Sequence, residues 1–324
     1  MLEGMKDDAY YIGFDLGGTK MIAALVDGDG TIVARARGRT PGDEGADAVA
    51  AAMAITIQEA CAQVGLAPEK VKAIGAAVPG VMDPVRGTVT LTNLNLKDYP
   101  LRATLEKALG LPVFMENDVN AGTWAEFQLG VAKGLHHVVG VFVGTGIGGG
   151  LILDGKLYRG WKGSAGEVGH VIIQEGGPLC GCGQYGCLEA FSSRNAMAKD
   201  AVSAAAAGNL PELIDKTGTD FRKFKSSIFE KGLEKGNPDI IKIVDRSAFH
   251  LGVALASVAM LLNPEAFVIG GGFADRLQER YLDLVLRTMR EHAMPSVINE
   301  VQVLMGSLGD DAVPLGAALL ARNA

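Results

Sequence analysis

Apolar and polar positions near the start of the chain alternate as they do in short β-strands. The pattern predicts strands over residues 10–16, 21–26 and 31–37. Glycine-rich turns separate them, first at Gly17-Gly18 and then at 27–30. Because three strands precede any helix, the segment is predicted to form a β-meander.

After the meander, helical and strand patterns alternate. An alanine-rich helical pattern comes first, and an apolar strand that ends at Pro79-Gly80 follows it. The predicted elements are a helix over 43–64, a strand over 71–78, a helix over 101–109, a strand over 113–116 and a helix over 119–129. This alternation is typical of an α/β protein.

The meander pattern then appears a second time, over 137–143, 148–153 and 156–158. Two α/β halves that each open with a glycine-turned meander indicate an internal repeat. We therefore expect a two-lobed phosphate-binding protein with a cleft between its lobes. The expected division is a small lobe over 1–117, joined by a closing helix over 313–324, and a large lobe over 118–312.

The rest of the second half is predicted to be mainly helical. Helices are expected between residues 194 and 262, with loops near Gly208, Gly218 and Gly236. A further strand over 266–269 ends in three consecutive glycines. The helix over 251–262 is too short to span a bilayer, and the amino terminus lacks the apolar core of a signal peptide. These features predict a cytoplasmic protein without a membrane partner.

The first turn of each meander has the composition of a phosphate-binding loop. Backbone N–H groups of consecutive glycines can face a phosphate, a threonine adds a hydroxyl, and Asp15 can hold a water bound to Mg²⁺. A plain glycine hairpin is the alternative for the first loop, but the arrangement recurs in the second half. The candidate nucleotide-binding residues are Asp15, Gly17, Gly18, Thr19, Lys20, Gly144, Thr145 and Gly146.

Two other nucleotide-binding motifs do not fit these loops. Gly144, Gly146 and Gly149 match the dinucleotide fingerprint G-x-G-x-x-G, but a strand pattern follows where that motif requires a helix. The Walker A motif G-x-x-x-x-G-K-[ST] is absent from the sequence. The run Gly270, Gly271 and Gly272 could lie against a purine, or could simply turn a strand into a helix.

Three of the four cysteines fall within eight residues, at Cys180, Cys182 and Cys187, shortly after His170. Three thiolates and one imidazole form a closed tetrahedral ligand set for a structural Zn²⁺. The interleaved glycines Gly181, Gly183 and Gly186 allow the tight turns that such convergence needs. The clustering predicts a zinc site rather than scattered core or surface cysteines.

A polar triplet, Glu116-Asn-Asp118, follows an apolar strand at the junction of the two halves. Asp118 could accept the proton of an attacking hydroxyl while Asn117 holds a neighbouring one, as phosphoryl transfer requires. Alternatively, Asn117 or Asp118 only caps the next helix. Glu167, His170 and Glu189 would supply further acceptors for a polyhydroxylated substrate.

Composition agrees with an ordinary globular protein. Hydrophobic residues make up 48% of the chain and charged residues 21%, and the net charge is -7. An acidic chain without a dense Lys/Arg block is unsuited to a nucleic-acid surface. Clustered thiols in a reducing compartment also favour metal binding over disulfides.

These motifs resemble the ROK family of repressors, open reading frames and kinases over nearly the whole chain. The resemblance rests on the segments 180–189, 166–170, 116–118 and 15–20. It implies the actin-like, ribonuclease H-like ATPase fold shared by sugar kinases, Hsp70 and actin, with an interlobe cleft. It also implies a homodimeric ATP- and Mg²⁺-dependent hexose kinase, most similar to the bacterial glucokinases.

The resemblance assigns Asp118 as the base and places zinc on His170, Cys180, Cys182 and Cys187. Hexose hydroxyls would be held by Gly80, Asn93, Asn117, Asp118, Glu167, His170 and Glu189. Asn95 and Tyr99 depart from the glycine-tryptophan of many glucokinases, so a kinase for N-acetylglucosamine, N-acetylmannosamine or fructose remains an alternative. A sugar-sensing regulator is the other alternative, although the first strand begins at Tyr10 and leaves no room before it for a winged helix.

Overall fold

The structure is a computed structural model that describes residues 9–67, 70–91, 94–210, 220–221 and 224–324. Its contacts divide the chain into two compact units. Unit 1 comprises Met1–Gly130, Leu157–Ala165 and Asp310–Ala324, and unit 2 comprises Val131–Lys156 and Gly166–Gly309. The division expected from the sequence, a small lobe over 1–117 with 313–324 and a large lobe over 118–312, stays a prediction.

Unit 1 is built on a five-stranded sheet with the order β3-β2-β1-β4-β8. The strands are β1 (Tyr10–Leu16), β2 (Lys20–Asp27), β3 (Ile32–Arg39), β4 (Val71–Val78) and β8 (Val113–Asn117). The first three form the predicted antiparallel meander, and β4 and β8 then add parallel to β1. The carboxyl ends of β1, β4 and β8 therefore lie along one edge of the sheet, where ligands of α/β proteins bind.

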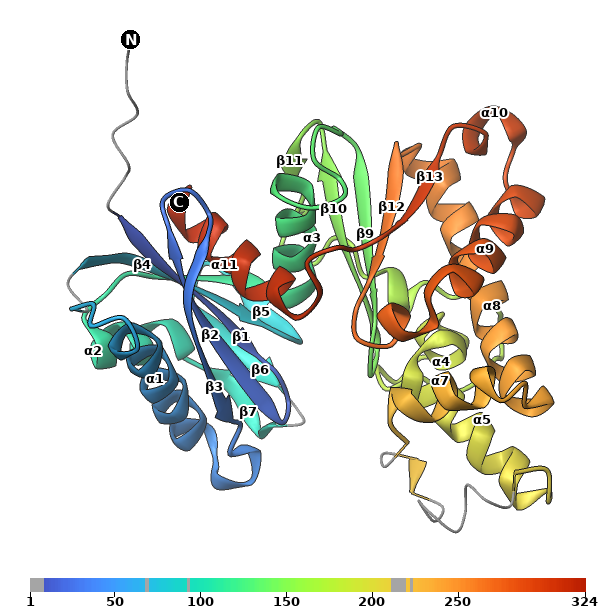
Figure 1. Cartoon of the computed structure of the whole chain (residues 1–324), viewed down its shortest axis with the longest axis horizontal. Coiled ribbons are helices and arrows are strands. Elements are labelled where there is room, and N and C mark those ends of the chain that lie inside the picture. The colour runs from blue at the N-terminus through green and yellow to red at the C-terminus, as the bar shows by residue number, and fades with distance from the viewer. Residues whose placement is uncertain (1–8, 68–69, 92–93, 211–219, 222–223) are drawn as a thin grey trace. The chain divides into compact units, whose positions relative to one another are not determined.

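Helices cover both faces of this sheet (Figure 1). On one face, α1 (Ala46–Ala62) and α2 (Leu101–Leu109) complete a core with large apolar side chains of the strands, such as Phe14. A 3-10 turn over Gly42–Glu44 and Gly45, with φ +93°, delay the start of α1 relative to the predicted helix.

The other face carries α11 (Ala312–Arg322), with α3 (Asp118–Gln128) packed against it. Small residues make a close approach possible here. A Cβ on Gly75 would lie 1.9 Å from the backbone oxygen of Ala317 in α11. The last helix is therefore an integral layer of unit 1.

A small antiparallel sheet in unit 1 was not predicted. It consists of β5 (Val81–Asp83), β6 (Thr88–Leu91) and β7 (Leu96–Tyr99). Its strands have only three or four residues, so their alternation is too short to be recognised in the sequence.

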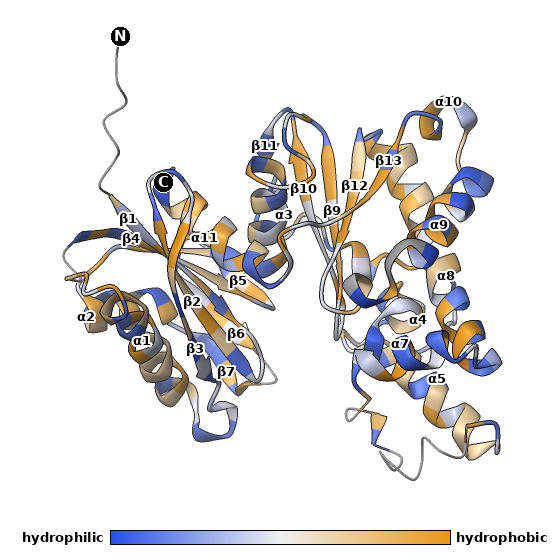
Figure 2. Ribbon diagram, viewed as in Figure 1, coloured by the Kyte–Doolittle hydropathy of each residue, from blue (hydrophilic) through white to orange (hydrophobic). Residues whose placement is uncertain are grey.

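Unit 2 repeats the strand order of unit 1, as β11-β10-β9-β12-β13. The strands are β9 (Val138–Val143), β10 (Ile147–Leu153), β11 (Lys156–Leu157), β12 (Ala266–Gly270) and β13 (Gln302–Met305). β9 and β10 form an antiparallel hairpin, and β12 and β13 add in parallel. The predicted internal repeat is thus present, and Figure 2 shows β9 and β10 as predominantly hydrophobic.

Helices of unit 2 surround the long helix α8 (Pro238–Leu262), which packs against α9 (Ala274–His292). The remaining elements of unit 2 are the 3-10 helix η4 (Val168–His170), with α4 (Glu189–Ser192), α5 (Arg194–Ala206), α7 (Ser226–Glu234) and α10 (Pro295–Ile298). The 3-10 helix η6 (Gly309–Asp311) begins at the last residue of unit 2 and ends in unit 1. The loop expected near Gly218 lies outside the described residues.

The predicted length of the apolar helix over 251–262 was wrong. α8 has 25 residues and begins directly after its N-cap, Asn237. Charged residues on its early turns interrupt the apolar pattern, so the first half of the helix was not recognised as part of the apolar segment. Length and composition alone would let α8 cross a membrane, but 61% of its apolar window is buried within the protein. α8 is therefore a core helix of unit 2.

Candidate active site and metal centre

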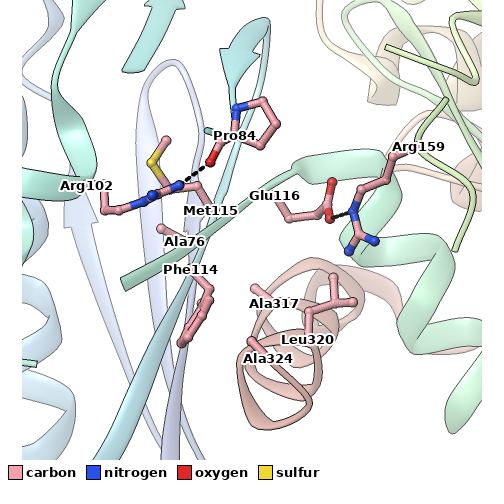
Figure 3. Close-up of a pocket in the computed structure, with 11 residues that line it drawn as sticks. Ala76, Pro84, Arg102, Phe114, Met115, Glu116, Arg159, Ala317, Leu320 and Ala324 are labelled. Atoms are coloured by element: carbon pink, nitrogen blue, oxygen red, sulfur yellow. Dashed lines mark hydrogen bonds and ion pairs between the residues drawn. The ribbon is translucent and has the colours of Figure 1, made fainter. Parts of the chain in front are cut away.

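Glu116, at the end of β8, holds the polar triplet in place. Its Oε1 accepts hydrogen bonds from the backbone N–H of Asn117 at 3.1 Å and from Nδ2 of Asn120 at 3.0 Å. Its Oε2 accepts one from Nε of Arg159 at 2.6 Å, and the carboxylate is buried. Figure 3 shows this ion pair beside a cavity of about 180 Å³ that residues of α11 also line. Glu116 is therefore a structural anchor rather than a reacting group.

Asn117, and not Asp118, is the N-cap of α3. Its side-chain oxygen accepts from the N–H groups of Val119 at 2.9 Å and of Asn120 at 3.1 Å. Asp118 is the first residue of the helix, is half-buried, and has an Oδ1 that also accepts from Val119 N–H, at 2.9 Å. The alternative of a simple cap thus applies to Asn117, and it does not account for a carboxylate at position 118.

Asp15 lies at the end of β1 in the same unit. The pKa of Asp15 is raised to about 7: burial is the largest cause, the negative charges of Asp118 and Asp310 add to it, and Lys20 opposes it. Two carboxylates close enough to interact, with one of them desolvated, are typical of sites that bind a cation or move a proton. The carboxyl ends of β1 and β8 therefore bring Asp15 and Asp118 together, a pairing that the sequence motifs did not predict.

The first glycine loop connects β1 to β2 through Gly17, Gly18 and Thr19. A Cβ on Gly17 would lie 2.6 Å from the backbone oxygen of Lys20, so the tight hairpin itself requires glycine there. The hydroxyl of Thr40 donates to the Gly17 oxygen at 2.7 Å and secures the loop. The Lys20 ammonium lies 3.3 Å from Asp310, with both side chains largely exposed.

The second loop, Gly144, Thr145 and Gly146, connects β9 to β10 in the same way. A strand follows it, as predicted, so it is not a dinucleotide fingerprint. Glu189 Oε2 accepts from the N–H of Ile147 at 3.0 Å and leaves no space for a side chain at Gly146.

Arg194, the first residue of α5, holds this second loop from another direction. Its backbone N–H donates to the Gly144 oxygen at 3.0 Å, and its Nη2 donates to Thr145 Oγ1 at 2.8 Å. Sequence reasoning missed Arg194, because no motif marks a contact between residues 49 positions apart.

The third glycine run turns β12 toward α9, which begins at Ala274. Gly271 has φ +92° and lies against the backbone of Val143, so the turn requires glycine at this position. A Cβ on Gly272 would meet nothing within 4 Å. The geometry accounts for Gly271 as a turn residue and leaves open space at Gly272.

The four predicted zinc ligands converge in unit 2. One potential ligand atom from each of His170, Cys180, Cys182 and Cys187 lies within 4.8 Å of the others. Cys182 Sγ and Cys187 Sγ are 3.7 Å apart, and Cys180 Sγ is 3.6 Å from His170 Nδ1. Tetrahedral Zn²⁺ requires separations of about 3.8 Å between sulfurs and about 3.6 Å between sulfur and nitrogen. These two separations therefore match those of a tetrahedral zinc site, and the cluster is a candidate metal centre.

Tight turns bring the cysteines together. Gly183 and Gly186 have φ +91° and +83°, and the Gly183 N–H donates to the Cys180 oxygen at 3.1 Å. Gly181 has no positive φ, so only two of the three interleaved glycines are needed for backbone conformation. Burial raises the pKa of Cys180 to about 12, so a bound cation would be needed to make this thiol a thiolate at neutral pH.

The residues expected to hold sugar hydroxyls are distributed over both units. Gly80, with φ +80°, lies between β4 and β5 in unit 1, together with Asn117 and Asp118. Glu167, His170 and Glu189 belong to unit 2. Asn93 lies outside the described residues.

Glu189 is already engaged by the protein on both oxygens. Its Oε1 lies 3.5 Å from Cys180 Sγ, and its Oε2 accepts from Ile147 N–H. The candidate zinc centre and the second glycine loop are therefore connected through this one carboxylate.

Two sheets of equal strand order, each opening with a glycine-turned hairpin, define the duplicated architecture of the actin-like ATPases. Carboxylates also lie near the end of β1, at Asp15, and directly after β8, at Asp118. The chain belongs to the ROK family, whose model matches residues 11–324.

Known proteins similar to the chain include sugar kinases and xylose repressors. A glucokinase from Streptomyces coelicolor is 34% identical, covering 96% of this chain and 97% of its own. An N-acetylmannosamine kinase from Citrobacter koseri is 33% identical, covering 96% and 98%. Among solved structures, a ROK family glucokinase from Streptomyces griseus in complex with glucose and AMPPNP has a TM-score of 0.85 and 33% identity, covering 98% of this chain and 100% of its own.

Proposed function

We propose that the protein is an ATP-dependent hexose kinase that phosphorylates D-glucose to glucose 6-phosphate. The observation that carries the proposal is the pair Asp15 and Asp118, on the carboxyl-end edge of the sheet in unit 1. Full-length similarity to glucokinases, one of which is solved with glucose and AMPPNP, supports the choice of substrates.

Asp118 acts as the general base in this proposal. Its carboxylate accepts the proton of the sugar hydroxyl as the oxygen attacks the terminal phosphate of ATP. The Asn117 cap and the Glu116 anchor fix the backbone around it, so that little reorganisation is needed during the reaction. The amide of Asn117 accepts two backbone N–H bonds through its oxygen, and its NH₂ group can still donate to a substrate hydroxyl.

The two glycine loops bind the phosphates of ATP. A Mg²⁺ ion bound with the nucleotide would neutralise charge on the transferred phosphate, and Asp15 would hold one of its waters. Asp15 suits this role, because a desolvated carboxylate with a raised pKa gains from a nearby cation.

The metal centre is proposed to hold one structural Zn²⁺. His170 Nδ1 faces the cysteine sulfurs, which leaves Nε2 as the ring nitrogen for a sugar hydroxyl. The metal would thereby orient a substrate ligand, and Glu189 would connect this region to the second loop. A homodimer is a further proposal that rests on the family resemblance, and light scattering tests it. A cytoplasmic location is proposed from the amino-terminal sequence, which lacks the apolar core of a signal peptide.

A panel of hexoses with purified protein and Mg-ATP tests the proposed function. Glucose is expected to give the highest kcat/KM, and N-acetylglucosamine a far lower one because of its bulkier 2-substituent. A higher kcat/KM for N-acetylmannosamine would reassign the substrate, in line with the kinase from Citrobacter koseri. Glucose binding without phosphoryl transfer from any nucleotide would favour the regulator instead.

A further inference from the structure

The Arg194 guanidinium lies beside the second glycine loop without a compensating negative charge. It is half-buried, and among the described residues no carboxylate forms an ion pair with it. Burial lowers the pKa of Arg194, and no charged neighbour offsets that effect. A partly desolvated cation with no partner is costly in a folded protein unless a ligand supplies the anion.

Most of the hydrogen-bonding capacity of Arg194 is unused. A guanidinium has five N–H donors, and the bond to Thr145 Oγ1 occupies one of them. Nε is buried and has no hydrogen-bond partner. Donors in this fixed planar arrangement match the oxygens of a phosphate.

The loop beside Arg194 has space for an anion. Thr145 is exposed, and a Cβ added to Gly144 would meet nothing within 4 Å. The φ of Gly144 is not in the positive range, so the backbone does not itself require glycine there. A ligand that approaches the backbone closely is a reason for glycine at this position.

We propose that Arg194 binds the polyphosphate chain of the nucleotide directly, beside the Gly144–Gly146 loop, while its bond to Thr145 fixes the guanidinium in place. This inference rests on the proposed kinase function and adds a binding residue to it. Arg194 would supply the positive charge that the loop itself lacks.

Calorimetric titration of the full chain with AMPPNP, inorganic tripolyphosphate and adenosine tests the proposal. Arg194→Met keeps the length of the side chain and removes its charge. This variant is expected to bind AMPPNP and tripolyphosphate about 10- to 100-fold more weakly, as loss of a charge-assisted hydrogen bond to phosphate implies. Binding of adenosine, which has no phosphate, should not change, and Arg194→Lys should fall between the two.

Two further variants separate a direct contact from a structural one. Thr145→Val removes the hydroxyl that Arg194 contacts, and is expected to weaken AMPPNP binding less than Arg194→Met does. If the double variant Arg194→Met/Thr145→Val bound AMPPNP no more weakly than Thr145→Val alone, Arg194 would act only through Thr145, and the proposal would be overturned. Arg280→Met is the matched control, because Arg280 pairs with Asp245 at 2.8 Å elsewhere in unit 2, and it should bind all three ligands normally.

Unchanged AMPPNP affinity in Arg194→Met, or no binding of AMPPNP and tripolyphosphate by the wild type, would also overturn the inference. The hexose assay on the wild type reports separately on the proposed function. A wild type that binds AMPPNP through Arg194 but phosphorylates no sugar would refute the kinase and leave the phosphate contact standing.

Discussion

Replacing Asp118 by Asn should abolish most of the turnover while leaving the fold nearly unchanged. The substitution keeps the size of the side chain and an oxygen that can accept from Val119 N–H. It removes the charge that would accept the proton of the sugar hydroxyl. Loss of a general base costs about 10²- to 10⁴-fold in kcat, which corresponds to about 2.7 to 5.4 kcal/mol of transition-state stabilisation.

The expected change in stability is much smaller. Asn117 remains in place as the N-cap of α3 and keeps its two backbone hydrogen bonds. Losing a carboxylate from the first turn of a helix costs about 0.3 to 1 kcal/mol. Removing that negative charge also relieves Asp15, whose pKa Asp118 raises, so the two effects partly cancel.

A coupled assay with glucose and Mg-ATP, run beside thermal melts, distinguishes these effects. Asn237→Ala is the matched control, because Asn237 caps α8 with bonds to the N–H groups of Asp239 and Ile240, both at 3.1 Å. It should cost about 1 kcal/mol of stability with an unchanged kcat. Near-normal kcat in Asp118→Asn would refute the base assignment, and so would a loss of activity that merely follows a loss of folding.

Three other outcomes are expected. Metal analysis should find one zinc per chain; Cys187→Ser should lose the zinc and lower the Tm, whereas Cys61→Ser, in the core of unit 1, should retain it. Full activity with clearly substoichiometric zinc would contradict this role. Tyr281→Phe removes a buried hydroxyl 3.0 Å from Ser247 Oγ and should destabilise the protein by about 1 kcal/mol without changing kcat. The pKa of Asp15 is about 7 in the folded protein and 3.8 ordinarily, so between pH 3.8 and pH 7 the folded state binds more protons at Asp15 than the unfolded state does. The free energy of unfolding therefore falls as the pH rises from 3.8 to 7. Asp15→Asn should therefore raise the Tm of the ligand-free protein at pH 8 but not at pH 4, and a lower Tm at pH 8 would refute the sign.

Local patterns in the sequence were sufficient for the repeated meanders and for the position of most strands. The strands Tyr10–Leu16 and Val71–Val78 have the predicted bounds. A continuous apolar run between turn residues marks where a buried strand begins and ends. Loop chemistry was equally local. Glycine runs next to threonine, and cysteines spaced for one metal ion, identified their segments without tertiary information.

Only the tertiary structure decided which polar groups meet. It assigned the helix cap to Asn117 rather than to Asp118, bound Glu189 to the loop at Ile147, and brought Arg194 to Thr145. It also showed that α8 has 25 residues and that three short strands form a separate sheet. Periodicity records which face of an element is buried, whereas the partner of a polar side chain depends on how elements distant in sequence pack together. That packing is a property of the whole fold, so no local pattern contains it.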